Sequence, residues 1–142
     1  MIRALELAKA AAEANEVPIG AVITKNGAII AEGENRNRRD NDPTAHAEMV
    51  AIRAAARVLG DFRLTGCDLW VTLEPCPMCA GAISHARIDR LYYGAADPKG
   101  GAVEHGPLTF SHPQCHHRPE VYGGMGEAES AALLRDFFAD RR

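Results

Sequence analysis

Pro75-Cys76-Pro77-Met78-Cys79 places two thiols three positions apart, with a proline on each side of the first one, Cys76. Residues three apart share one face of a helix, so a helix that begins here brings Cys76 and Cys79 to one point. Pro77 suits the first turn, where its missing N–H is not needed, and the positive end of the helix lowers the pKa of thiols there. A second cluster, His46-Ala47-Glu48, lies 26 residues upstream.

These residue types indicate a metal site. Zinc is held by thiolate sulfur and imidazole nitrogen, and a catalytic site gives it three protein ligands and one water. Cys76, Cys79 and His46 form such a set. Zinc lowers the pKa of water to roughly 7, and Glu48 is placed to take that proton and later return it. H-x-E with a downstream P-C-x-x-C is the known signature of zinc nucleobase deaminases.

A lone C-x-x-C has other interpretations: a redox pair, a structural zinc knuckle or two buried thiols. A redox pair does not need His46 and Glu48 upstream, and a structural zinc site needs a fourth ligand at similar spacing. Both clusters fall at predicted helix starts. The pattern therefore favours catalytic zinc.

Length and composition predict one domain over residues 1–142, with a core of ordinary size. Apolar residues make up 46% of the chain and charged residues 25%, as in typical globular proteins, and no apolar run is long enough to span a membrane. The chain starts with an amphipathic helix pattern and not a signal peptide, which predicts a cytoplasmic protein. The net charge of −3 argues against indiscriminate nucleic-acid binding, but it is compatible with a folded RNA bound through a local basic patch.

Apolar periodicity and turn residues predict the order of helices and strands. Asn26-Gly27 is a hairpin turn between two strands, and two strand-then-helix transitions in succession predict parallel neighbours in one sheet. Predicted helices cover 2–15, 44–59, 77–86 and 127–142, and predicted strands cover 19–25, 28–33, 69–72, 88–93 and 121–122. The intervening residues 95–120 are either a functional loop or hide short helices.

The residues around the zinc motifs add a family resemblance. Residues 16–22, 42–48 and 72–83 resemble the bacterial tRNA-specific adenosine deaminases. The similarity continues at residues 86–88, 93–95, 97, 99 and 117–118, and it ends with residues 134, 137–138 and 142. It covers nearly the whole chain. The zinc motifs alone identify only the deaminase superfamily, whereas the flanking matches narrow it to the tRNA branch.

The resemblance implies a three-layer α/β/α cytidine-deaminase-like fold with a five-stranded mixed sheet. It also implies a homodimer with one zinc ion per subunit, which converts adenosine to inosine at the wobble position of a tRNA anticodon stem-loop. His46, Cys76 and Cys79 would then be the zinc ligands and Glu48 the proton shuttle.

The same resemblance implies three substrate-binding residues: Asn35, Asp97 and Lys99. Asn35 matches the family asparagine that hydrogen-bonds the flipped nucleoside, although the residues alone would make it a turn residue after a strand. Pro98 and Glu104 depart from the family loop, which leaves open how this loop contacts RNA.

Several other residues have structural interpretations that compete with functional ones. A second metal site could form in a crowded segment, but its spacing favours a polar, RNA-facing loop: His105, His112, Cys115, His116 and His117. The arginines within residues 36–39 could contact phosphates, and the phenylalanines at 137–138 could stack on bases, although at least one of these two should be buried. Glu74 is predicted to bind backbone N–H groups near the zinc loop, and Cys67 to be a small buried hydrophobe.

Two rival functions stay open. One is a deaminase of a free base, guanine or cytosine, since Pro77 and Met78 fit a guanine deaminase equally well. Residues 80–88 and 137–138 favour the tRNA branch instead. The other rival is a non-catalytic zinc or RNA-binding module, which would have no need of Glu48.

Overall fold

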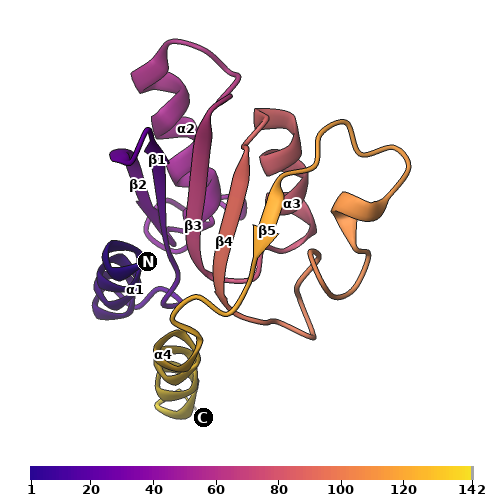
Figure 1. Ribbon diagram of the computed structural model, residues 1–142. Helices are drawn as coiled ribbons and strands as arrows, with labels where there is room; N and C mark the ends of the chain where they lie inside the picture. Colours follow the sequence, from indigo (N-terminus) through magenta and orange to yellow (C-terminus); the bar gives the residue numbers. More distant parts are fainter. Residues whose placement is uncertain (142) are drawn as a thin grey trace.

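The computed structural model describes residues 1–141 (Figure 1). The elements follow the predicted order: α1 (Ile2–Glu13), β1 (Gly20–Lys25), β2 (Ala28–Glu34), α2 (Ala47–Leu59), β3 (Cys67–Leu73), α3 (Pro77–Ala86), β4 (Arg90–Ala95), η1 (Thr109–Ser111), β5 (Glu120–Tyr122) and α4 (Glu127–Ala139). The short helix η1 lies inside residues 95–120, for which short helices were one of the two expectations. Arg142, the end of the predicted last helix, lies outside the described residues.

The five strands form one mixed sheet in the order β2-β1-β3-β4-β5. Strand β1 pairs antiparallel with β2 and β3, while β3, β4 and β5 run parallel to one another. The two strand-then-helix units thus give parallel neighbours, and the predicted five-stranded mixed sheet is confirmed.

Helices cover both faces of the sheet, which confirms the predicted three-layer fold (Figure 1). Gly33 of β2 faces α2, whereas Gly20 of β1 faces α1 and Gly94 of β4 faces α4. The larger core lies between the sheet and helices α2 and α3, and it includes Cys67, buried as predicted. Among residues 1–141, no helix has the length and apolar character needed to cross a membrane.

The start of α2 differs from the prediction. The helix begins at Ala47 and not near Thr44, so His46 is its N-cap, with φ −69° and ψ 155°. The cause is a turn before it, in which Asp42 Oδ1 accepts hydrogen bonds from the backbone N–H and the hydroxyl of Thr44, at 2.8 and 2.7 Å. This turn occupies residues that would otherwise form the first turn of the helix.

Gly33 permits the close packing of β2 on α2, and its replacement by alanine should be destabilising. A Cβ there would lie 2.7 Å from the backbone nitrogen of Ala51 and also too close to the carbonyl oxygen of Ala47. We expect Gly33→Ala to lower the free energy of unfolding by about 1–3 kcal/mol or more, because neither backbone group can yield without moving α2. Urea denaturation measures this loss.

Gly81 provides the matched control. It lies inside α3, and a Cβ there would meet no atom within 4 Å. Gly81→Ala should therefore leave stability unchanged or raise it by up to about 1 kcal/mol. Equal stabilities of the two variants would contradict the proposed role of Gly33.

Candidate active site

The structure brings one imidazole and two thiols together where α2 and α3 begin. Nδ1 of His46 lies 3.5 Å from Sγ of Cys76 and 3.5 Å from Sγ of Cys79. His46 is the N-cap of α2 and Cys76 the N-cap of α3, with Pro77 as the first helical residue. The two clusters are separated in the sequence, and they come into contact because the starts of α2 and α3 lie next to each other.

The donor set fits a zinc ion. One ligand atom from each of the three residues lies within 4.8 Å of the other two, and within residues 1–141 no other group of three His, Cys, Asp or Glu residues is gathered in this way. Imidazole nitrogen and thiolate sulfur are the donors that zinc prefers, and three protein ligands leave one position for water. A structural zinc site with four protein ligands is therefore not supported.

The thiols and the neighbouring glutamate have perturbed proton affinities. The pKa of Cys76 falls to about 4, first because the Cys79 thiol donates to it and then because His46 does. The pKa of Cys79 is raised, because it donates that hydrogen bond and is buried. Burial also raises the pKa of Glu48 to about 6, and its side chain lies in the first turn of α2, one residue beyond Ala47. A carboxyl of this kind can exchange a proton near neutral pH.

Asn35 contacts the same helix start. It directly follows β2, is only 4% exposed, and its Oδ1 accepts a 2.8 Å hydrogen bond from the backbone N–H of Ala47. Only an acceptor can pair with that N–H, so the side-chain orientation is determined. Among the described residues, its Nδ2 has no hydrogen-bond partner, which leaves two N–H donors for a ligand. The predicted substrate-binding role of Asn35 stays a prediction with this geometric support.

Asp97 and Lys99 lie in the turn after β4. Asp97 Oδ1 accepts hydrogen bonds from the backbone N–H groups of Lys99 and Gly100, at 3.2 and 2.9 Å, and the Lys99 side chain is exposed. The turn is joined to the zinc loop, residues 74–76 between β3 and α3, by Glu74, whose Oε1 accepts from the backbone N–H of Asp97 at 3.0 Å. Their substrate-binding role stays a prediction.

Glu74 accepts hydrogen bonds from backbone N–H groups near the zinc loop, as predicted, and so connects the loop after β4 to it. Its buried carboxylate accepts from the backbone N–H groups of Val103 and Glu104, at 3.1 and 2.9 Å, and lies 2.8 Å from Nδ1 of His105. Burial alone would raise the pKa of Glu74, but these hydrogen bonds together hold it below its usual value. The residue directly precedes Pro75 and Cys76, so it links the two loops at the site.

Replacing Glu74 with glutamine should cost stability. The amide nitrogen would face N–H donors where a carboxylate oxygen now accepts, and a buried donor without an acceptor costs about 1–3 kcal/mol. We expect the free energy of unfolding, measured in urea, to fall by that amount. Glu120→Gln on the exposed edge of β5 is the control and should change it by less than about 1 kcal/mol. A similar loss in both variants would contradict the role of Glu74.

The crowded His and Cys residues at 105–117 serve different contacts. His105 binds Glu74, Nε2 of His117 lies 2.7 Å from the carbonyl oxygen of Ile88, and the Cys115 thiol donates to the carbonyl of His117 at 3.1 Å. They are not gathered around one point in the described part of the chain. The alternative of a second metal site therefore gains no support.

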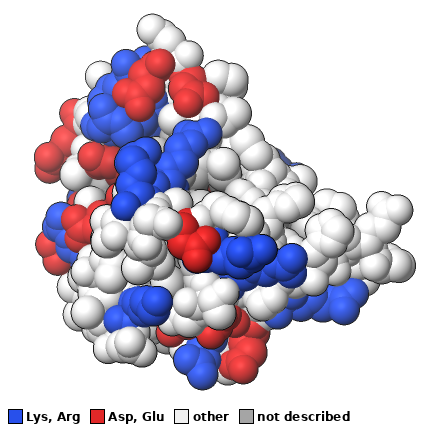
Figure 2. Space-filling view, turned by 90° about the horizontal axis from the view of Figure 1, so that it is seen from above, with Lys and Arg blue, Asp and Glu red and all other residues white. Residues whose placement is uncertain are grey.

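Two of the three arginines in residues 36–39 have acidic partners. Arg36 pairs with Asp40 at 3.0 Å, and Arg39 pairs with Glu16 at 3.3 Å, whereas the Arg38 side chain is exposed. Seen from above, basic side chains form separate groups, several of them with acidic side chains beside them, and a wide part of the face carries neither (Figure 2). Among residues 1–141, this face therefore shows no continuous basic surface.

The C-terminal phenylalanines divide as predicted. Phe137 is 8% exposed and Phe138 is 47% exposed. Their rings are arranged edge to face, with 5.3 Å between the ring centroids. Phe137 thus belongs to the core, and Phe138 is left on the surface.

Comparison with known proteins places these observations in a family. Residues 1–95 match the family model described as the cytidine and deoxycytidylate deaminase zinc-binding region. A tRNA-specific adenosine deaminase of Agrobacterium fabrum is 60% identical over 139 residues, which cover 98% of this chain and 91% of that protein.

Two solved structures are informative. One, from a study of A-to-I editing by tRNA:A34 deaminases at the wobble position, is 61% identical, covers 92% of this chain and 95% of its own, and superposes with a TM-score of 0.91. The other, a guanine deaminase from Bacillus subtilis, is 52% identical but covers 67% of this chain and 61% of its own, with a TM-score of 0.65.

Proposed function

The chain belongs to the tRNA-specific adenosine deaminases of the cytidine and deoxycytidylate deaminase family, and from this premise we propose that it converts adenosine to inosine at the wobble position of a tRNA anticodon. The observation that carries the proposal is the contact of His46, Cys76 and Cys79 at two helix starts, with the buried carboxyl of Glu48 in the first turn of α2. The catalytic unit is one domain over residues 1–142.

The three ligands would hold one zinc ion, which would act as a Lewis acid and lower the pKa of a bound water to roughly 7. Glu48 takes one proton from the attacking water and delivers it to N1 of the adenine ring as the water oxygen bonds to C6. Glu48 then carries the second proton to the amino group at C6. The C6–N bond breaks, ammonia leaves, and the carbonyl of inosine remains, so that one water is consumed for each ammonia released.

Asn35 is proposed to orient the nucleoside. Its Oδ1 is occupied by Ala47, so its free Nδ2 can donate to the substrate beside Glu48. Bases of an anticodon loop are already partly unstacked, and extruding one costs less than from a duplex. Asp97 and Lys99, in the turn that Glu74 joins to the zinc loop, would contact the same RNA segment. The family resemblance extends the proposal to a cytoplasmic homodimer with one zinc ion per subunit.

A free-base deaminase is the second candidate, because the guanine deaminase structure shares 52% identity over part of the chain. Its lower coverage makes it the weaker match. A non-catalytic zinc module would not require a buried, ionisable Glu48 at the site.

One experiment separates these functions. The zinc-loaded protein is incubated with an anticodon stem-loop carrying adenosine at the wobble position, and with free guanine and cytidine in parallel, and nucleosides are identified by mass spectrometry. Inosine in the RNA alone supports the proposal. Turnover of a free base with untouched RNA would retain the chemistry and overturn the substrate, and no turnover at all would favour the non-catalytic module.

A further inference from the structure

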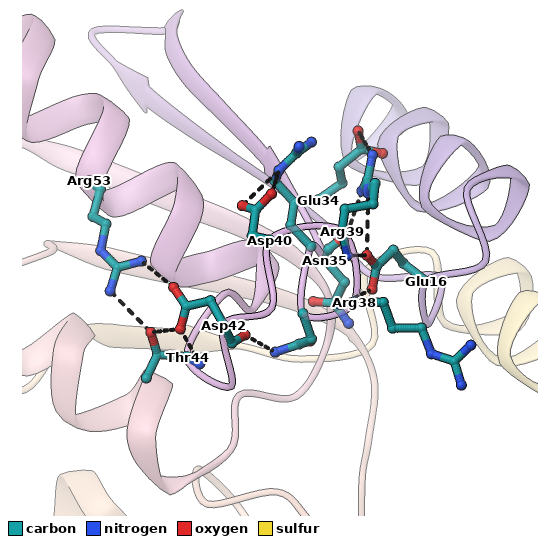
Figure 3. A network of polar contacts seen from close by, with 11 residues as sticks. Glu16, Glu34, Asn35, Arg38, Arg39, Asp40, Asp42, Thr44 and Arg53 are labelled. Carbon is teal, nitrogen blue, oxygen red and sulfur yellow. Dashed lines mark hydrogen bonds and ion pairs between the residues drawn. The ribbon is translucent and has the colours of Figure 1, made fainter.

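Glu16, between α1 and β1, is a buried carboxylate that the mechanism above does not use. It is 2% exposed, and both of its oxygens bind the loop that follows β2 (Figure 3). Oε1 accepts from the backbone N–H of Arg38 at 3.2 Å, and Oε2 accepts from the backbone N–H of Arg39 at 2.9 Å. Oε2 also accepts from Nε of Arg39 at 3.3 Å. A single side chain thus fixes two successive peptide groups and one guanidinium.

The guanidinium extends the contact to Asn35. Nη2 of Arg39 donates to the backbone carbonyl of Asn35 at 2.6 Å, while its Nε is bound by Glu16 (Figure 3). The backbone N–H of Asn35 donates to the carbonyl of Ile19 at 3.2 Å, and its Oδ1 accepts from Ala47. Asn35 is therefore held on its backbone from two sides and on its side chain from a third.

This arrangement resists small displacements. The Arg39 side chain is 28% exposed and its partner Glu16 is buried, so this ion pair is partly shielded from solvent. Fully exposed ion pairs contribute little to stability, and the shielding distinguishes this pair from them. Burial alone would raise the pKa of Glu16, but the hydrogen bonds from Arg39 and Arg38 outweigh it and lower the pKa, which keeps the carboxylate ionised at neutral pH. A guanidinium held by a charged, buried partner presents its second N–H in one direction.

We propose that Glu16 is a positioning residue of the deaminase: acting through Arg39, it fixes Asn35 so that the free side-chain amide meets the target nucleoside. The inference rests on the proposed function, in which Asn35 binds that nucleoside. A displacement of about 1 Å in a group that orients a substrate can lower the rate by about 100-fold. Loosening Asn35 by removing its distant support would therefore reduce turnover without touching the zinc ligands.

The test is a double-mutant cycle with Glu16→Gln and Asn35→Ala, in single-turnover assays on the wobble-adenosine stem-loop. Glu16→Gln retains the size of the side chain but puts an amide nitrogen against N–H donors. We expect it to lower kcat/KM by roughly 10- to 100-fold while zinc content is unchanged. In the Asn35→Ala background the same change should have less than about a twofold effect, because the group it positions is gone.

Two further variants make the cycle interpretable. Glu13→Gln, on the exposed end of α1, is the matched control and should leave kcat/KM unchanged. Arg39→Gln removes the bridge from a partly exposed position, and it stands in for Glu16→Gln if that variant does not fold; it should show the same loss and the same dependence on Asn35.

The contradicting results are specific. An equal loss from Glu16→Gln with and without Asn35, or a loss matched by a fall in zinc content, would show a general structural role and overturn the inference. Wild-type turnover of guanine and not RNA would overturn the proposed function instead. The same cycle run with guanine would then test the inference, because the chain between Glu16 and Asn35 does not depend on the substrate.

Discussion

Glu48→Gln should lower kcat for deamination by on the order of 10⁴-fold, the upper range for a group that transfers protons. Glutamine has nearly the same volume, so the buried site in α2 is filled as before, but the amide cannot accept a proton from water or return one. Both proton deliveries assigned to Glu48 are lost together. Single-turnover measurement of inosine on the anticodon stem-loop gives the rate.

The expected result includes what does not change. Zinc content, measured by atomic absorption, and the urea midpoint should stay close to those of the wild type, because Glu48 is not among the gathered ligands. Glu13→Gln, an exposed glutamate of α1, should retain full activity. Turnover of Glu48→Gln within tenfold of the wild type would rule out the assigned role.

Cys79→Ser should remove both zinc and activity. Cys79 is fully buried, and its sulfur is one of the three donors at the site. A serine hydroxyl is a poor substitute for a thiolate with zinc. Loss of an outer-shell partner alone weakens metal binding by about 10- to 100-fold, so loss of a ligand should cost more than about 100-fold. Zinc per chain, measured after dialysis against a weak chelator, should fall to a small fraction of one.

Cys115→Ser is the matched control. This half-buried thiol contacts Ser84 and the carbonyl of His117, away from the three donors, and a hydroxyl can make the same hydrogen bonds. It should retain zinc and activity. Full zinc content in Cys79→Ser, or equal zinc loss in both variants, would contradict the ligand assignment.

The two cysteines of the zinc motif were accessible from sequence because their geometry is local. Cys76 and Cys79 are one helical turn apart, and Pro77 marks the helix start, so their convergence needs only the 3.6-residue period. Alternation and turn residues likewise predicted the hairpin around Asn26-Gly27 and the parallel neighbours β3 and β4. The family resemblance, and not periodicity, supplied Asn35 as a substrate residue.

The predicted start of α2 was wrong because side chains bind backbone N–H groups ahead of the helix. Thr44 was predicted to open α2, but its backbone N–H is bound by Asp42, and the N–H of Ala47 is bound by Asn35 from 12 residues away. Propensity rules see only neighbouring residues, and they cannot count hydrogen bonds that a distant side chain offers to a helix start.

The sequence by itself determined the type of chemistry: two thiols, an imidazole and a carboxyl at two helix starts, with the spacing that zinc requires. The tertiary structure alone decided which distant partners support the site. Glu16 reaches Arg39 across 23 residues and Glu74 reaches His105 across 31, and nothing periodic marks either pair. The physical reason is that a hydrogen bond depends on proximity in space, which local periodicity predicts within one helix or hairpin but not between loops joined only by the fold.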